Sequence, residues 1–311
     1  VTGGVSGVAS LNGQTGALAF IAPPQGRLTL ARGVPVMTTT QSAKTALYYT
    51  PYVGNQLPIF DGSNMIPTAF AEISVATTDT AKNPAAIGAS KVNDWFVWID
   101  GGTLRLSHGP DWTNDTTRSA GTALTRVNGV LLNAVAITNG PGAERGTYVG
   151  TTRSDGSGQL NWILGSAANG GGVAVLNVWN AYNRVDVTTS VADNTGSWTY
   201  TSSAARASND SASNRVWFVS GLAEDGADAA VSQRIATSTA TGAFGRIGIG
   251  FDSTSSYAFQ ALAVSPASGV IYNAPLIVHG AISPQLGAHY LQALESGDGS
   301  NSTTFLGGAP T

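Results

Sequence analysis

The stretch WFVWIDGGTLRL, residues 95–106, decides the fold class. Aromatic and β-branched residues at 95–99 and an alternating run at 103–106 flank the turn Asp100-Gly101-Gly102. Asp and Gly tolerate the positive φ angles that a tight hairpin turn requires. We therefore expect two antiparallel strands joined by a short turn, in a protein that repeats this arrangement.

The same pattern recurs toward the C-terminus. Asn128-Gly129, the strongest short hairpin signal, separates apolar runs at 125–127 and 130–132. Flanking glycines and β-branched residues favour strands for the other short apolar runs. These further strands are 148–152 paired with 159–164, 185–191 paired with 197–201, and the buried central runs 216–219 and 247–251.

A helix competes with a strand only at residues 225–237, where the run ADAAVSQR fits a short helix or an edge strand. Short strands separated by turns, without a long-period repeat, are typical of a sandwich or barrel and disfavour a propeller or solenoid. We predict an all-β fold whose body is an antiparallel, jelly-roll-like β-sandwich.

The chain divides into three predicted parts. Residues 1–38 are rich in glycine, which contributes no side-chain burial, and form an N-terminal attachment or assembly arm with short strands at 17–21 and 27–30; a flexible linker is the alternative. Residues 39–270 form the β-sandwich body. Residues 271–311 form a C-terminal β tail and oligomerisation region, in which 289–295 and 303–306 make a final hairpin.

Composition excludes several classes of function. Charged residues make up only 11% of the 311 residues, the net charge is −3, and 15 Lys and Arg leave no basic surface for nucleic acid. No apolar run approaches the roughly 18 residues of a membrane-spanning helix. Residues 1–20 lack the charged and apolar parts of a signal peptide. The absence of cysteine excludes disulfides and thiol chemistry.

The sequence offers little for metal or cofactor chemistry. His108, His279 and His289 lie far apart and outside the short spacings of metal sites. A phosphate-binding loop and a nucleophile elbow are both missing from the sequence. We expect no cofactor, no metal and no enzymatic activity.

Glycoside hydrolysis is the serious enzymatic alternative, because it needs only two carboxyls at a defined separation. The candidate pairs are Asp111 with Asp115, and Glu224 with Asp225 and Asp228. All of them lie in turn-like segments, where Asp commonly bonds its own backbone. Structural roles are therefore favoured for these carboxyls.

Glycan binding needs fewer specific residues than glycoside hydrolysis, since sugars rest on aromatic rings beside Asn, Asp and Gln. Trp112 with Asp111 and Asn114 has this mixture in a Pro-Gly loop, and Trp179 with Tyr182 is a second candidate. The competing interpretation makes each tryptophan part of the core, where a large ring buries roughly 150–250 Å².

Three segments carry a resemblance to a known group of proteins. Residues 8–17, VASLNGQTGA, resemble a segment found near the start of phage tail-fibre and tail-knob proteins. Residues 48–62 and 145–156, the latter followed by QLNW at 159–162, are similar to segments of tail or fibre proteins encoded by phages and prophages of alphaproteobacteria. This resemblance implies a β-rich, trimeric virion component that contacts host surface glycan.

Residues and resemblance together predict a non-enzymatic virion structural protein: a tail fibre, spike or head-decoration component on the tail or capsid surface. Its expected partners are further copies of itself in a homotrimer, other virion proteins through the N-terminal arm, and host surface polysaccharide. Nucleic acid binding and membrane insertion are not expected. The alternatives are a glycan-degrading tailspike enzyme and a bacterial surface adhesin.

Overall fold

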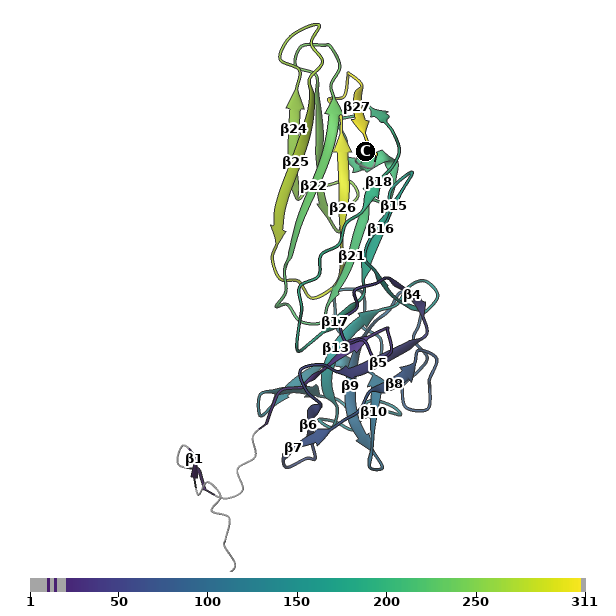
Figure 1. The fold of residues 1–311 in the computed structure, drawn as a ribbon, viewed down its shortest axis with the longest axis vertical. Coiled ribbons are helices and arrows are strands. Elements are labelled where there is room, and N and C mark those ends of the chain that lie inside the picture. The colour runs from purple at the N-terminus through teal and green to yellow at the C-terminus, as the bar shows by residue number, and fades with distance from the viewer. Residues whose placement is uncertain (1–9, 12–13, 16–20, 309–311) are drawn as a thin grey trace, which may run out of the picture.

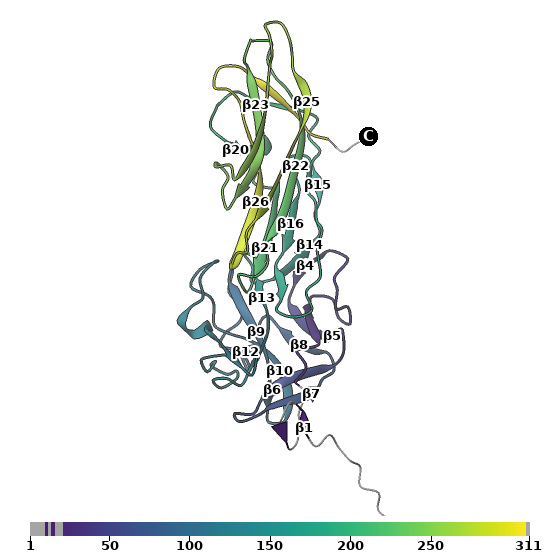
Figure 2. The same ribbon diagram turned by 90° about the vertical axis from the view of Figure 1, so that its left-hand side faces the viewer.

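The computed structural model describes residues 10–11, 14–15 and 21–308, and this part of the chain is all-β. It contains two 3-10 turns, η1 (Ala120–Thr122) and η2 (Ser208–Asp210), and no α-helix. No helix in these residues could cross a membrane. The molecule is elongated and has two lobes, one above the other in Figures 1 and 2.

The first lobe is built on a six-stranded sheet in the order β10-β9-β13-β12-β11, with β17 paired to β13. Two smaller sheets, β3-β5-β8 and β6-β7, complete it. The strands of this lobe are β3 (Gly26–Thr29), β5 (Ala46–Pro51), β6 (Gln56–Phe60), β7 (Met65–Ala69), β8 (Ile73–Ala76), β9 (Val92–Asp100), β10 (Thr103–His108), β11 (Leu124–Val127), β12 (Val130–Asn133), β13 (Thr147–Arg153) and β17 (Val178–Asn180). Separately, β1 (Ser10–Leu11) pairs with β2 (Gln14–Thr15).

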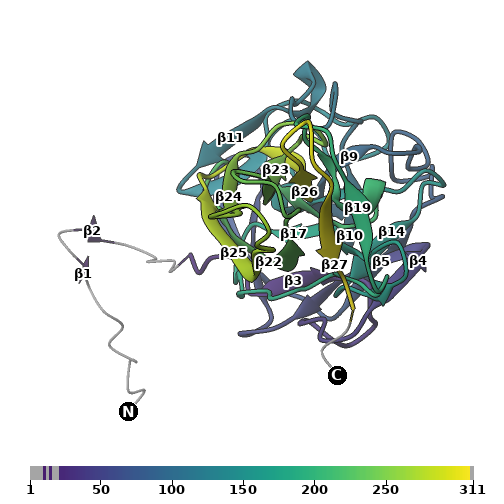
Figure 3. The same ribbon diagram turned by 90° about the horizontal axis from the view of Figure 1, so that it is seen from above.

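The second lobe is a sandwich of two sheets that face each other (Figure 3). One sheet has the order β24-β23-β26-β21-β16-β14-β4, with β20 paired to β26, and the other has the order β19-β27-β22-β25. Their strands, with the small β15–β18 pair, are β4 (Gln41–Lys44), β14 (Leu160–Ile163), β15 (Ala167–Ala168), β16 (Val173–Leu176), β18 (Ala192–Asp193), β19 (Trp198–Tyr200), β20 (Arg206–Ala207), β21 (Arg215–Ser220), β22 (Ala227–Ala236), β23 (Phe244–Phe251), β24 (Phe259–Val264), β25 (Asn273–Ile282), β26 (Gly287–Ser296) and β27 (Thr303–Leu306). The all-β, sandwich-like fold predicted from the sequence is confirmed.

Apolar burial explains both lobes. The first lobe packs around Trp95, which is fully buried, and Leu28 from β3. The second lobe packs around Ile235, Ile247 and Phe305, which come from both sheets of the sandwich. Burying a side chain of this size stabilises the fold by about 1.5–3 kcal/mol.

The two hairpins with the clearest turn signals are confirmed. β9 and β10 pair from Asp100 and Thr103 across Gly101 and Gly102, whose φ angles are +54° and +86°. β11 and β12 pair across residues 128 and 129, where φ is +50° and +86°. Positive φ at both central residues matches the right-handed twist of the flanking strands. The predicted central strands are also present, as β21 and β23.

The helix considered for residues 225–237 is wrong, and the strand alternative is right. β22 covers ten of these residues and pairs with β25 along its whole length. Its side chains alternate between half-buried and exposed positions up to Arg234. That period of two fits a strand with one face toward a core and not a helical stripe.

Three of the predicted pairings are wrong. Residues 185–191 form no strand, and β19 pairs with β27 instead. β13 pairs with β9, whereas β14 pairs with β16 and β4. In the C-terminal part both expected strands form, but β26 pairs with β21 and β23, and β27 pairs with β22. In each case at least one of the two strands pairs with a strand that lies farther away in the sequence than the predicted partner.

The predicted N-terminal strand at 17–21 lies almost entirely outside the described residues. The second one forms β3, which is buried and pairs with β5. β25, β26 and β27, from the predicted C-terminal tail, pair with strands of the predicted body. The division of the chain at residues 38 and 270 stays a prediction.

Candidate functional site

Trp112, the first candidate for glycan contact, lies in the core of the first lobe. Only 3% of its surface is exposed. Its Nε1 donates a hydrogen bond to Asp94 Oδ2 at 3.1 Å, and the guanidinium of Arg118 lies 4.5 Å from the ring centroid. Its indole ring is therefore covered by protein.

Asp111 and Asn114, its predicted partners, serve the surrounding loop. Asp111 Oδ1 accepts a hydrogen bond from Asn93 Nδ2 at 2.9 Å. Asn114 is exposed, and its Oδ1 accepts a bond from the backbone N of Thr116 at 2.9 Å. Local bonds of this kind are the usual role of Asx residues in turns.

Trp179 and Tyr182, the second candidate pair, belong to the same buried cluster as Trp112. Trp179 is 8% exposed, and its Nε1 donates to Asp225 Oδ2 at 2.7 Å. The hydroxyl of Tyr182 accepts a bond from Leu131 N at 3.3 Å. The structure thus gathers the two tryptophans inside the molecule. Glycan contact through them stays a prediction, and it would require the rings to leave their present contacts.

A fully buried carboxylate, Asp94, organises this cluster. It accepts bonds from Arg118 at 2.8 and 3.2 Å and from Thr151 Oγ1 at 2.6 Å, in addition to Trp112. Arg118 also donates to the backbone O of Gly221 at 2.6 Å, just after β21. Asp94 therefore ties the first lobe to the turn between β21 and β22 of the second lobe.

A second buried carboxylate, Glu295 on β26, has the same role in the second lobe. It accepts bonds from Trp198 Nε1 at 2.6 Å and from Arg206 Nε at 2.9 Å. The bond from Trp198 joins β26 to β19 of the facing sheet, and the bond from Arg206 joins β26 to β20, its neighbour in the same sheet. Burial raises the pKa of Glu295, while the bonds from Trp198 and Arg206 oppose that rise.

The carboxyls considered for glycoside hydrolysis are engaged in ion pairs. Asp115 receives two bonds of 3.0 Å from Arg153. Arg184 bridges Glu224 at 2.6 Å and Asp225 at 2.5 Å. Asp115, Glu224 and Asp225 are therefore each held by a guanidinium. Asp111 lies 4.0 Å from Lys91 Nζ, and Asp228 lies 2.6 Å from His279 Nε2.

The three histidines lie apart, and the described residues contain no group of three or more His, Cys, Asp or Glu that could hold a metal ion. His108 is buried, and its ring nitrogens lie 2.6 Å from Gly109 O and 3.0 Å from Ala85 O. Burial lowers the pKa of His108 below its usual 6.5. His108 is therefore a core residue, and burial opposes its protonation while the two carbonyls favour it.

An open groove lies along one edge of β22. β22 pairs with β25 throughout, but with β27 only at residues 234–236. Gly308 N donates to Asp193 O at 2.8 Å, so the chain leaves β22 soon after β27 ends. Within the described chain, nothing pairs with the second edge of β22 over residues 227–233. Along such an edge, alternate residues present their N–H and C=O groups.

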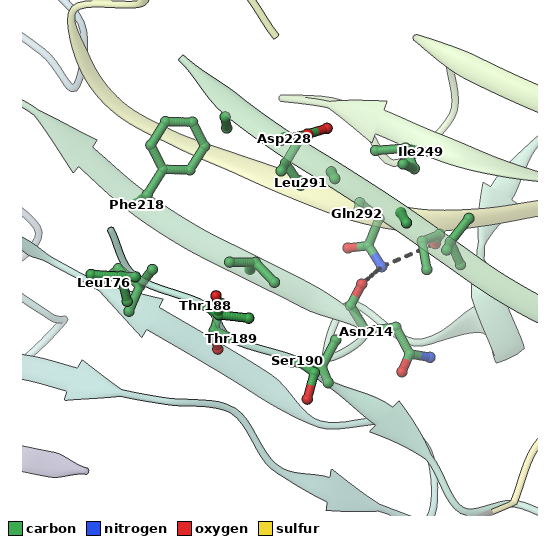
Figure 4. Close-up of a pocket in the computed structure, with 18 of the residues that line it drawn as sticks. Leu176, Thr188, Thr189, Ser190, Asn214, Phe218, Asp228, Ile249, Leu291 and Gln292 are labelled. Carbon is green, nitrogen blue, oxygen red and sulfur yellow. Dashed lines mark hydrogen bonds between the residues drawn. The ribbon is translucent and has the colours of Figure 1, made fainter. Parts of the chain in front are cut away.

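The groove opens into a cavity of about 920 Å³ between the two sheets of the sandwich. Its apolar lining includes Leu176 on β16, Phe218 on β21 and Leu291 on β26, all of which are only partly buried (Figure 4). Charged residues, among them Arg184 and Asp228, also line it. Residues 185–191, including Thr188, Thr189 and Ser190, line another side (Figure 4). Beside β22, the inner faces of the two sheets are therefore not covered by a further strand of the described chain.

Two buried polar atoms at this cavity lack a hydrogen-bond partner in the described structure. They are Nε1 of Trp162, a residue that is 7% exposed, and Oγ1 of Thr189. A buried polar group without a partner costs roughly 1–3 kcal/mol. Both residues line the cavity, so its wall contains two buried polar atoms that the described chain leaves without a partner.

A second unusual surface is the apolar edge, formed by β24, β25 and the loop between them. β24 and β25 pack against each other (Figure 1). The apolar edge consists of exposed large side chains: Leu262, Val264, Val270, Ile271, Tyr272 and Ile277. Ile277 is 68% exposed and Ile271 is 56% exposed. Exposed apolar side chains gathered on neighbouring elements are a common feature of association surfaces.

Comparison with known proteins found no matching family model, no matching curated protein and no matching solved structure.

Sequence reasoning did not identify the groove or the apolar edge. One available signal was the alternation of Val185, Val187, Thr189 and Val191, which has the period of a strand although the segment joins no sheet. Another was the apolar run VIY at residues 270–272, between polar and Gly-Pro-rich neighbours. Neither signal says from sequence alone which surface stays uncovered.

Proposed function

We propose that this chain is a non-enzymatic virion structural protein, a tail fibre, spike or head-decoration component that serves particle assembly and attachment to the host surface. The observation that carries the proposal is the apolar edge. An exposed apolar surface marks a site of association with another macromolecule, and a virion component meets copies of itself and other virion proteins.

The interior supports the same proposal. Buried Asp94 and Glu295 are each held by an arginine and an indole N–H. Breaking such a buried pair costs about 3–5 kcal/mol, so these networks rigidify each lobe without any disulfide. An elongated, rigid and cysteine-free β protein suits a particle that must persist outside cells.

The resemblance of residues 8–17, 48–62 and 145–156 to phage tail and fibre segments supports the choice of a virion among possible assemblies. Closed symmetry removes the hazard of exposed edges, and a homotrimer through the apolar edge is the assembly we propose. Contact with host polysaccharide belongs to the same proposal.

The test is the mass of the full chain at micromolar concentration, measured by mass photometry. We expect a closed oligomer, and we expect Ile277→Asp to dissociate it, because the substitution places a charge in an apolar interface. Val53→Asp is the matched control, since Val53 is 63% exposed but lies outside the apolar edge. A monomeric wild-type chain, or an oligomer that survives Ile277→Asp unchanged, contradicts assembly through this edge.

Location is tested on intact particles. Gold-labelled antibodies raised against the chain should decorate the tail or the capsid surface in electron micrographs. Labelling of bacterial envelopes instead of particles would indicate a surface adhesin. Release of reducing ends from host capsule by the purified chain would indicate a glycan-degrading enzyme.

A further inference from the structure

We propose that the open groove along β22 binds an extended strand from a second copy of this chain, namely residues 16–20 of its N-terminal segment. The inference does not rest on assignment of the protein to a virion. It rests on the unpaired edge at residues 227–233, the partly apolar cavity beneath it and the chemistry of the segment that would fill it.

The groove requires an extended occupant. A free strand edge offers N–H and C=O groups at every second residue, and only another extended backbone satisfies them in series. Seven residues of strand span about 23 Å, enough for a typical inserted strand of 5–6 residues. One face of that strand would lie over Leu176, Phe218 and Leu291, so it must carry apolar side chains at alternate positions.

Residues 16–20, GALAF, meet these requirements. Leu18 and Phe20 alternate with Ala17 and Ala19, so two large side chains share one face and two small ones share the other. No charged side chain occurs anywhere in residues 1–26, and the first proline is Pro23. Such a strand brings no charge into the apolar cavity and keeps every N–H available for pairing.

The position of the next residue favours a second copy as the donor. Ile21 packs against the cluster that contains Met65 of β7, in the first lobe. β7 lies at the end of that lobe remote from β22 (Figure 1). Five residues of strand span only about 17 Å. We therefore assign the donor segment to a neighbouring molecule, which makes the proposed contact heterologous, between different surfaces of two copies.

The donor is tested by Leu18→Asp in the full chain, with Ala17→Asp as the matched control. Both substitutions add the same charge one residue apart, but only Leu18 would face the apolar cavity. Sedimentation velocity over a concentration series should show self-association weakened about tenfold or more by Leu18→Asp, and little changed by Ala17→Asp. Equal effects of the two substitutions, or no effect of either, overturn the proposal.

The acceptor is tested by Ala229→Leu, with Ala230→Leu as its control. Ala229 is half-buried on the inner face of β22, and Ala230 is exposed and pairs with His279 on the outer face. A leucine at 229 fills the groove, so we expect weaker self-association for that variant alone. Melting temperatures are measured for all four variants. If Ala229→Leu unfolds the protein, the smaller substitution Ala229→Val replaces it.

Mixing separates this contact from assembly through the apolar edge. Leu18→Asp retains an intact groove and Ala229→Leu retains an intact donor, so one functional contact is restored when the two are combined. With Ile277→Asp added to both variants to remove association through the apolar edge, the 1:1 mixture should therefore show association that neither variant shows alone. A mixture no more associated than its parts overturns the inference. A second result would also overturn the inference: a monomeric wild-type chain whose melting temperature is lowered by Leu18→Asp. That result would indicate that residues 16–20 insert into the groove of the same molecule. Failure here leaves the Ile277→Asp test of the apolar edge unaffected.

Discussion

Replacement of Trp112 by alanine separates a core role from a ligand-binding role. The ring is 3% exposed, and truncation of a buried aromatic side chain to alanine costs about 3–5 kcal/mol. Loss of the Nε1 bond removes one donor from the buried carboxylate of Asp94, which adds roughly 1 kcal/mol. The free energy of unfolding should fall by about 5 kcal/mol in total. For a chain of this size that corresponds to a decrease of roughly 10 °C in melting temperature.

Differential scanning calorimetry measures this decrease, and two variants calibrate it. Trp112→Phe keeps most of the ring but lacks the N–H, so it should lose less stability than Trp112→Ala. Asn114→Ala, in the exposed loop nearby, should change stability little. A Trp112→Ala protein with an unchanged melting temperature and reduced adhesion to host cells would refute the core assignment, because it would mean that the ring is available to a glycan.

Three other predictions test the buried framework. Gly221→Ala should cost about 1–3 kcal/mol in urea denaturation, because the added Cβ would collide with the hydroxyl of Tyr148; an unchanged midpoint would contradict this packing. Burial lowers the pKa of His108, so below about pH 6.5 the unfolded chain binds more protons and stability falls with acidification. His108→Gln should therefore show a smaller difference in melting temperature between pH 7 and pH 5 than the wild type, and equal differences would refute this origin. Arg206→Ala should cost about 3–5 kcal/mol at pH 7 by leaving Glu295 without its cation. That cost should be smaller at low pH, where Glu295 is protonated, and a pH-independent cost would count against the ion pair.

Sequence reasoning succeeded where the determining chemistry is local. The turns at Gly101-Gly102 and Asn128-Gly129 need positive φ at consecutive positions, and few residue types supply it. Each turn also brings its two flanking strands together, so turn and pairing are predicted at once. The all-β class follows from many such signals and does not depend on any one of them.

The predicted strand pairings were wrong where a strand pairs with a partner that is distant in sequence. β26 and β27 are separated by a polar, Gly-rich loop that resembles a hairpin turn, yet β26 lies between β21 and β23 in one sheet and β27 belongs to the other. The apolar pattern of a strand specifies which face is buried but not which neighbour supplies the backbone partners. Residues 185–191 show the same limit, because an alternating pattern does not guarantee a free edge to pair with.

The predicted binding residues illustrate a related limit. An exposed tryptophan that stacks on a sugar and a buried one that closes a core have the same side chain and the same polar neighbours in sequence. For Trp112 and Trp179 the deciding contacts come from Asp94 and Asp225, which lie 18 and 46 residues away. Both indole N–H groups are satisfied by carboxylates, a combination that sequence proximity could not show.

The groove exists because two strands of one sheet differ in length. β22 has ten residues and β25 matches it, but β27 has four and pairs at only three positions. A Gly-Gly pair at 307–308 then directs the chain toward Asp193. Seven residues of β22 are left beside an apolar cavity, where an unpaired edge is a template for another strand. Edges kept only for solvent are commonly protected by charged or proline residues; residues 227–233, ADAAVSQ, contain no proline and a single charged residue, the exposed Asp228. That composition is the physical reason to seek the missing strand in a neighbouring molecule.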